Sequence, residues 1–230
     1  MRGLAYLVHL YTAAGVLCAL AALTALWRGD SRLTLLWLVA ATFIDATDGW
    51  LARRADVHRR AALIDGARMD DIIDYLTYVV VPGLLLLFTH RLPAAWGVAV
   101  AGAMFLSSIL GFSRKDAKTV DHLFTGFPSY WNIVAVYLIA AGTPPAWNAA
   151  LLVGLSALVF VPIRYVYPSR TQTLWWVTVP FCAVWSVQVL AMIWKLPDVP
   201  IGLVVSSLAF PIYYTALSFW LTLTRRSGSR

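Results

Sequence analysis

Residues 45–74 read DATDGWLARRADVHRRAALIDGARMDDIID and contain seven of the chain's eleven acidic residues, all of which are Asp. Long apolar runs stand on both sides of this segment. Because carboxylates are costly inside a lipid bilayer, so dense a group of acids between apolar runs indicates a functional site. The segment therefore predicts two membrane helices joined by a short polar loop, with the acids gathered at one end of both helices.

The rest of the chain has the composition of a polytopic membrane protein. Of its 230 residues, 60% are hydrophobic and 13% are charged, with a mean hydropathy of +0.74. Ordinary globular chains contain about 25% charged residues. This composition excludes a disordered protein, a disulfide scaffold, a soluble nucleic-acid binder and a large extramembrane domain. Since a spanning helix needs about 20 mostly apolar residues, we expect a single all-α domain over residues 1–230, a bundle of about eight transmembrane helices.

Eight apolar runs give the expected spans, at about residues 4–27, 33–51, 70–89, 94–112, 130–141, 147–167, 173–194 and 201–224. Fourteen of the eighteen Lys and Arg residues then fall on the same side as the two termini. Basic residues accumulate in cytoplasmic loops, so the pattern predicts cytoplasmic termini and a cytoplasmic acidic segment. Topology and anionic lipids also explain the net charge of +7 without nucleic acid. Cys18 and Cys182 stand alone in apolar runs and are interpreted as core residues.

The spacing within residues 45–74 places the key side chains on one face of each helix. These residues are Asp45, Asp48, Gly49 and Ala52 on the first helix and Gly66, Asp70 and Asp74 on the second. A short loop makes the two helices antiparallel neighbours, so we expect the four carboxylates of these stripes to converge. Asp56 and Asp65, taken singly, are better explained as solvated loop charges.

Four converging carboxylates raise one another's pKa unless cations balance their charge. Ligand sets made only of oxygen favour hard ions such as Mg²⁺ and Mn²⁺. A pair of these ions is suited to hold a pyrophosphate during an in-line displacement. Gly49 and Ala52 would leave room for a phosphorylated ligand, and Arg53 adds a guanidinium whose geometry suits phosphate.

This pattern resembles the signature of the CDP-alcohol phosphotransferases. The matching string is Asp45-x2-Asp48-Gly49-x2-Ala52-Arg53 followed by Gly66-x3-Asp70-x3-Asp74. Twelve residues separate Arg53 from Gly66, more than in most of that family. This longer spacing, the chain length and residues 116–119 and 127–132 resemble the bacterial phosphatidylcholine synthase branch.

The resemblance implies transfer of the phosphatidyl group of CDP-diacylglycerol to choline, with release of CMP. It implies two divalent ions, Mn²⁺ or Mg²⁺, held by Asp45, Asp48 and Asp70, with Asp74 as the catalytic base that shares in metal binding. The nucleotide contacts it implies are Asp45, Gly49, Ala52 and Arg53. It also implies a homodimer in the inner membrane of a bacterium.

Other polar and aromatic residues are candidates for substrate contacts. His9 and Thr12 resemble positions that touch the nucleotide in related enzymes. Because quaternary ammonium groups bind aromatic faces, the helix start at Tyr130, Trp131 and Asn132 is our candidate for the choline pocket, with Tyr75 and Tyr78 as alternatives. Gly66 is a further substrate-binding candidate. Lys118, beside Arg114 and Lys115, would bind lipid phosphate, although the positive-inside rule alone would also place a basic residue there.

Two other functions compete with this interpretation. The same fold could use serine, inositol or glycerol phosphate as the acceptor, or pair CDP-choline with diacylglycerol. Alternatively, the acids could form the translocation site of a divalent-cation or proton-coupled transporter. Transporters generally place ionisable residues near the bilayer midplane. The acids of this chain are expected at helix ends, which argues against transport.

Overall fold

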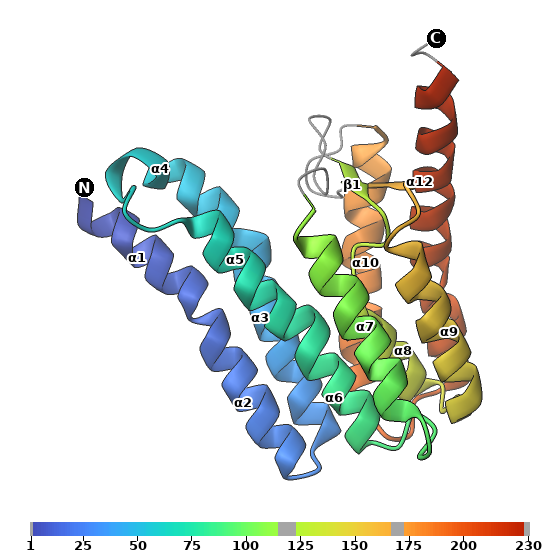
Figure 1. The fold of residues 1–230 in the computed structure, drawn as a ribbon. Helices are drawn as coiled ribbons and strands as arrows, with labels where there is room; N and C mark the ends of the chain where they lie inside the picture. Colours follow the sequence, from blue (N-terminus) through green and yellow to red (C-terminus); the bar gives the residue numbers. More distant parts are fainter. Residues whose placement is uncertain (1, 115–122, 167–172, 228–230) are drawn as a thin grey trace.

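The computed structural model of the chain describes residues 2–114, 123–166 and 173–227. These residues are helical almost throughout, with one short sheet of two strands (Figure 1). The helices lie side by side and leave the sheet at one end of the bundle, near the top of Figure 1. The expected all-α class is therefore confirmed, and the chain is a membrane-embedded helix bundle.

The N-terminal half begins with a helical hairpin, in which the first two helices together form one arm and the third helix forms the other. Helices α1 (Arg2–Ala13) and α2 (Gly15–Trp27) follow each other with almost no interruption and pack against α3 (Ser31–Arg54). The Asp30 carboxylate caps α3 by accepting a 2.8 Å hydrogen bond from the backbone N–H of Leu33. This turn reverses the chain and sends α3 back toward the end where α1 begins (Figure 1).

The acidic segment continues through a short connection into a third long helical stretch. It contains α4 (Val57–Arg60), α5 (Gly66–Asp74), the π-helix η1 (Tyr75–Val80) and α6 (Val81–Phe88). Pro82 cannot donate a backbone hydrogen bond, and its ring would clash with the carbonyl of Tyr78 in a regular α-helix. The wider turns of η1, directly before it, relieve this clash. Such π-helical turns are frequent at functional sites.

The C-terminal half contains the remaining helices and the sheet. The helices are α7 (Gly97–Phe112), α8 (Trp131–Ala140), α9 (Pro145–Leu158), α10 (Trp175–Trp194), α11 (Ile201–Ser207) and α12 (Ala209–Ser227). Strands β1 (Leu123–Thr125) and β2 (Arg164–Val166) pair in antiparallel orientation. Strand β2 also packs against α12, which fixes the sheet to the bundle.

Five helical stretches in the described part of the chain are long and apolar enough to cross a membrane. They are Gly3–Trp27, Ser31–Arg54, Gly66–Phe88, Trp175–Trp194 and Ile201–Thr224. Three further apolar helices, α7, α8 and α9, are shorter. They occupy the other expected positions, but the ten residues of α8 extend only about 15 Å. This is about half the thickness of a bilayer's hydrocarbon core, which is about 30 Å.

One expected span is wrong at its C-terminal end. The run expected to be helical to residue 167 ends as α9 at Leu158, and Arg164–Val166 is strand β2. Pro162 explains this end, because proline interrupts a helix and pushes the preceding residue to extended backbone. The last expected span is found as the stretch Ile201–Thr224, in which α11 and α12 meet at Leu208. Pro211 lies in the first turn of α12, the position in a helix where proline is tolerated.

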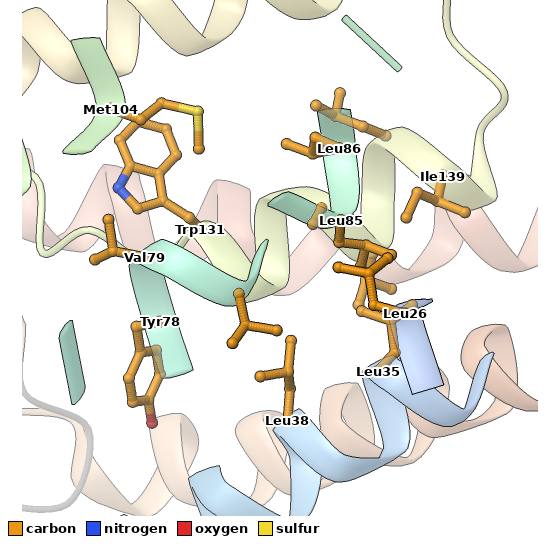
Figure 2. Packing of buried hydrophobic residues seen from close by; sticks show 14 of the residues in the cluster. Leu26, Leu35, Leu38, Tyr78, Val79, Leu85, Leu86, Met104, Trp131 and Ile139 are labelled. Atoms are coloured by element: carbon orange, nitrogen blue, oxygen red, sulfur yellow. The ribbon is translucent and has the colours of Figure 1, made fainter. Parts of the chain in front are cut away.

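The largest apolar core joins the helices that carry the acidic segment to the rest of the bundle. It includes Leu26 and Leu35 near the α2–α3 turn, Leu85 on α6 and Trp131 on α8 (Figure 2). Because α3, η1 and α8 all contribute buried side chains to this cluster, their relative positions are fixed by close packing. The ends of these helices that carry polar side chains are thereby held close to one another, next to this core.

Candidate active site

Three of the four predicted carboxylates gather where α3 faces α5. Asp45 of α3 and Asp70 and Asp74 of α5 each offer one carboxylate oxygen, and these three atoms lie within 4.8 Å of one another. All three side chains are half-buried. The spacing of four residues puts Asp70 and Asp74 on one face of α5. This donor set, all oxygen and negatively charged, fits a hard divalent cation. We call these three residues the carboxylate group.

Asp48 is not a member of the carboxylate group, so three of the four acids expected to converge meet within 4.8 Å. Its side chain is buried, and the Thr12 side chain of α1 lies beside its carboxylate. The cause is the packing of α1 against the last turns of α3. Asp48 lies one helical turn beyond Asp45 on α3. At that level α1 places the side chain of Thr12 next to it. Thr12, predicted as a nucleotide contact, is therefore brought beside Asp48.

Tyr78 connects the π-helix to the carboxylate group. Its hydroxyl donates a 2.8 Å hydrogen bond to Oδ2 of Asp45. The Thr42 hydroxyl, one turn before Asp45 on α3, lies beside the Tyr78 hydroxyl. Tyr78 is predicted from the sequence only as an alternative acceptor contact, and its bond to Asp45 is a finding of the structure. The available signal was spacing, because Asp70, Asp74 and Tyr78 recur every four residues.

Asn132 is tied to the same polar network, whereas Trp131 is not. The Nδ2 of Asn132 donates to the Thr42 hydroxyl over 3.3 Å. The Trp131 side chain is fully buried, and its Nε1 donates a 2.7 Å hydrogen bond to the Ser108 hydroxyl. Trp131 therefore belongs to the core cluster and presents no open ring face (Figure 2).

Tyr130 lies between the carboxylate group and a set of further aromatic rings. Its ring centroid is 6.0 Å from that of Tyr78. Phe127, three residues earlier, packs edge-on against Tyr165 of β2 at 6.5 Å. Burial raises the pKa of the Tyr165 phenol, so this ring stays neutral. Tyr165 in turn stacks on Tyr214 at 6.0 Å. The alternative candidate Tyr75 instead donates to the Phe105 carbonyl of α7.

Gly66 allows α5 to approach α1 closely. A Cβ atom at Gly66 would lie 3.0 Å from Cε1 of His9, tighter than almost all real contacts of this kind. His9 is buried, and its Nε2 has no hydrogen-bond partner among the described residues. An unpaired buried nitrogen is costly in a folded protein, and such groups often mark sites that bind something else.

The remaining motif residues follow the carboxylates along α3. Gly49 and Ala52 are half-buried, and Ala52 packs against the small apolar cluster formed with α1. Arg53 is exposed in the last turn of α3. Lys118, a predicted lipid contact, lies outside the described residues. The structure thus assembles α1, α3 and α5 around the carboxylate group and leaves Arg53 at its outer edge.

The two acids interpreted as loop charges have structural partners. The Asp65 carboxylate caps α5 by accepting from the backbone N–H of Arg68 over 3.1 Å. Asp56 faces Arg60, with Oδ2 and Nε 3.8 Å apart. Pairs this exposed contribute at most about 1 kcal/mol. Neither acid is a member of the carboxylate group.

Comparison with known proteins identifies the family. No family model matches the chain. It is 39% identical over 195 residues to a phosphatidylcholine synthase from Legionella bozemanae, an alignment covering 81% of this chain and 90% of that protein. It is 34% identical over 214 residues to a phosphatidylcholine synthase from Pseudomonas aeruginosa, covering 93% of this chain and 90% of the relative.

The chain belongs to the phosphatidylcholine synthase family. A third member, the phosphatidylcholine synthase from Legionella pneumophila, is 42% identical over 172 residues, which is 74% of this chain and 67% of that protein. The resemblance inferred from residues 45–74 is therefore confirmed at the level of the family. The alignment with the Pseudomonas aeruginosa relative covers nearly the whole chain.

Proposed function

We propose that the chain transfers the phosphatidyl group of CDP-diacylglycerol to the hydroxyl of choline and releases CMP. The observation that supports this most strongly is the carboxylate group, whose three oxygens lie within 4.8 Å of one another in a member of this family. An all-oxygen cluster at the ends of apolar helices suits a pyrophosphate-containing lipid. The acyl chains of such a lipid remain in the bilayer while its nucleotide lies at the interface.

Divalent ions, Mn²⁺ or Mg²⁺, bound at this site would neutralise the pyrophosphate of the substrate. In the proposal, Asp45, Asp70 and Asp74 supply ligands from the carboxylate group, and Asp48 supplies one from the adjacent turn of α3. Arg53, exposed at the edge of the site, binds the phosphate of the nucleotide with its guanidinium. Thr12 and His9 of α1, together with Gly49 and Ala52 of α3, line the nucleotide side.

Asp74 serves as the base in the proposed reaction. It lies one helical turn further along α5 than Asp70, on the side of η1 and Tyr78. Its carboxylate accepts the choline hydroxyl proton as the alcohol oxygen bonds to phosphorus and CMP departs. General-base assistance of this kind is worth about 10²–10⁴-fold in rate.

The acceptor site is proposed on the side of Tyr78, Tyr130 and Asn132, where η1 packs against α8. Gly66, packed against His9 of α1, is proposed as a substrate contact on the nucleotide side. A quaternary ammonium is attracted to aromatic faces, and the rings of Tyr78 and Tyr130 lie 6.0 Å apart. We further propose an enzyme of the bacterial inner membrane, with its termini and active site in the cytoplasm, that acts as a homodimer.

The test is an acceptor panel with the purified protein. CDP-diacylglycerol is offered with labelled choline, serine, inositol or glycerol phosphate, and CDP-choline is offered with diacylglycerol in parallel. The proposal predicts a lipid product and stoichiometric CMP with choline alone. If product forms with another acceptor, the conclusions on the fold and the reaction class stand, but the assignment of choline as the acceptor is overturned.

A further inference from the structure

A second polar site lies at the opposite end of the bundle from the carboxylate group. A cavity of about 470 Å³ opens between the α2–α3 turn, the end of α6 and the segment after α10. Arg28, Arg32 and Arg91 line it, with Asp30 as its single acidic residue. Arg32 and Asp45 are thirteen residues apart on α3, which corresponds to about 20 Å. The cavity is therefore separate from the proposed active site.

The positive charge of this cavity is only partly balanced in the described part of the chain, because three guanidinium groups line it with one carboxylate. The Asp30 carboxylate is engaged as the cap of α3, where it accepts from the Leu33 N–H. Among residues 2–114, 123–166 and 173–227, no acid forms an ion pair with any of the three guanidinium groups. Arg91 shows the deficit most clearly, because its Nε is buried without a hydrogen-bond partner. Leaving such a donor unpaired is costly.

Neighbouring groups hold the cavity in a shape suited to an anion. The Arg32 guanidinium donates to the backbone carbonyl of Leu196, which fixes it at the cavity wall. The N-terminus of α3, a helix of 24 residues, begins at Ser31 on the same wall. The partial positive charge at a helix N-terminus adds to the attraction for an anion.

Exposed tryptophans around the cavity indicate its depth in the membrane. Trp27, Trp96 and Trp194 flank the lining segments and are 88%, 48% and 69% exposed. Tryptophan is enriched at the level of lipid headgroups. The basic residues expected on the side away from the termini are Arg28, Arg32, Arg91 and Lys195, and three of these four line this cavity. The positive-inside rule disfavours basic residues on that side, so topology does not explain why three arginines line one cavity there. A bound anion would explain it.

We propose that this cavity binds a phosphate group, supplied by an anionic phospholipid of the surrounding leaflet or by free phosphate. The guanidinium groups of Arg28, Arg32 and Arg91 provide the charge and the hydrogen-bond donors. The phosphate oxygens accept from guanidinium N–H groups of the three arginines. The site is independent of phosphatidyl transfer and does not require divalent ions.

The experiment uses the whole protein, purified in a non-ionic detergent with excess EDTA so that no divalent ion bridges phosphate to the carboxylate group. Dihexanoyl phosphatidylglycerol and inorganic phosphate are titrated separately at constant ionic strength. The readouts are the dissociation constant and the thermal midpoint. Arg91→Gln and Arg28→Gln remove lining charges. Arg28 is exposed, so its substitution does not threaten folding.

Lys195→Gln is the matched control, since it removes an exposed cation at the same end but outside the lining. We expect saturable binding by the wild type, a dissociation constant raised about tenfold or more in Arg91→Gln and Arg28→Gln, and no change in Lys195→Gln. Binding of phosphatidylglycerol alone identifies a lipid headgroup, and equal binding of inorganic phosphate identifies the free anion. Absence of binding, or equal losses in all three variants, overturns the proposal.

Discussion

The Tyr78 hydroxyl donates a 2.8 Å hydrogen bond to the Asp45 carboxylate, linking the π-helix η1 to the acidic end of α3. This bond orients one of the three carboxylates that meet within 4.8 Å. A carboxylate oxygen that accepts from a phenol is held in one rotamer. Tyr78 is thus a positioning residue for the proposed metal site.

Replacing Tyr78 with Phe removes this hydroxyl and keeps the ring. We expect turnover to fall about ten- to a hundredfold and the Mn²⁺ concentration for half-maximal activity to rise, since a hydrogen bond to a charged group contributes about 1.5–3 kcal/mol. Tyr75→Phe is the control, because the Tyr75 hydroxyl donates to the Phe105 carbonyl and not to an acid. Equal effects of the two substitutions would refute the positioning role.

Asp74 and Asp48 should fail in different ways when each is replaced with Asn. In Asp74→Asn, CDP-diacylglycerol binding persists but turnover falls by about 10²–10⁴-fold, because an amide cannot accept the choline proton. In Asp48→Asn, metal and nucleotide binding weaken as well. The measurements are metal-dependent CDP-diacylglycerol binding and single-turnover formation of phosphatidylcholine. Retained turnover in Asp74→Asn would show that Asp74 is not the base.

The close approach of α5 to α1 makes Gly66 sensitive to substitution. Gly66→Ala places a Cβ 3.0 Å from Cε1 of His9 and must displace that side chain. We expect weaker CDP-diacylglycerol binding and about 1–3 kcal/mol of destabilisation. Gly102→Ala is the control, since a Cβ there meets nothing within 4 Å. If Gly66→Ala binds substrate like the wild type, this packing is not important for the site.

The proposed orientation can be tested with single cysteines in a chain whose Cys18 and Cys182 have been replaced. Leu63, 91% exposed between α4 and α5, lies at the end of the bundle that carries the carboxylate group. Ala95, exposed between α6 and α7, lies at the other end. An impermeant thiol reagent added outside intact cells should label Ala95→Cys and spare Leu63→Cys. The reverse pattern would contradict a cytoplasmic active site.

The sequence was sufficient for the features that depend on periodicity. Apolar runs located the helices, and the spacing of Asp70 and Asp74 placed them on one face of α5. The end of α9 at Leu158 was missed because Phe160 and Val161 continue an apolar run that hydropathy alone cannot distinguish from a helix. Pro162 was the local signal, but membrane helices often tolerate proline.

The missed parts of the site depend on tertiary packing. Asp48 lies in the same helical stripe as Asp45, yet it is buried beside Thr12 of another helix. Trp131 and Asn132 are adjacent in sequence but have different surroundings. Trp131 lies in the core and donates to the Ser108 hydroxyl, whereas Asn132 donates to the Thr42 hydroxyl, one turn from Asp45. Which of two neighbouring side chains enters the core and which enters the site depends on the helix that faces them. The periodicity of the sequence does not record it.

The central claim is that the carboxylate group forms the metal centre for phosphatidyl transfer, and Asp70→Asn compared with Asp71→Asn tests it most directly. The two acids are adjacent on α5, but only Asp70 belongs to the group. Mn²⁺ binding followed by electron paramagnetic resonance is measured with phosphatidylcholine formation on the same samples. We predict that Asp70→Asn loses Mn²⁺ binding and product, while Asp71→Asn keeps both. Unchanged Mn²⁺ binding and turnover in Asp70→Asn would contradict the account.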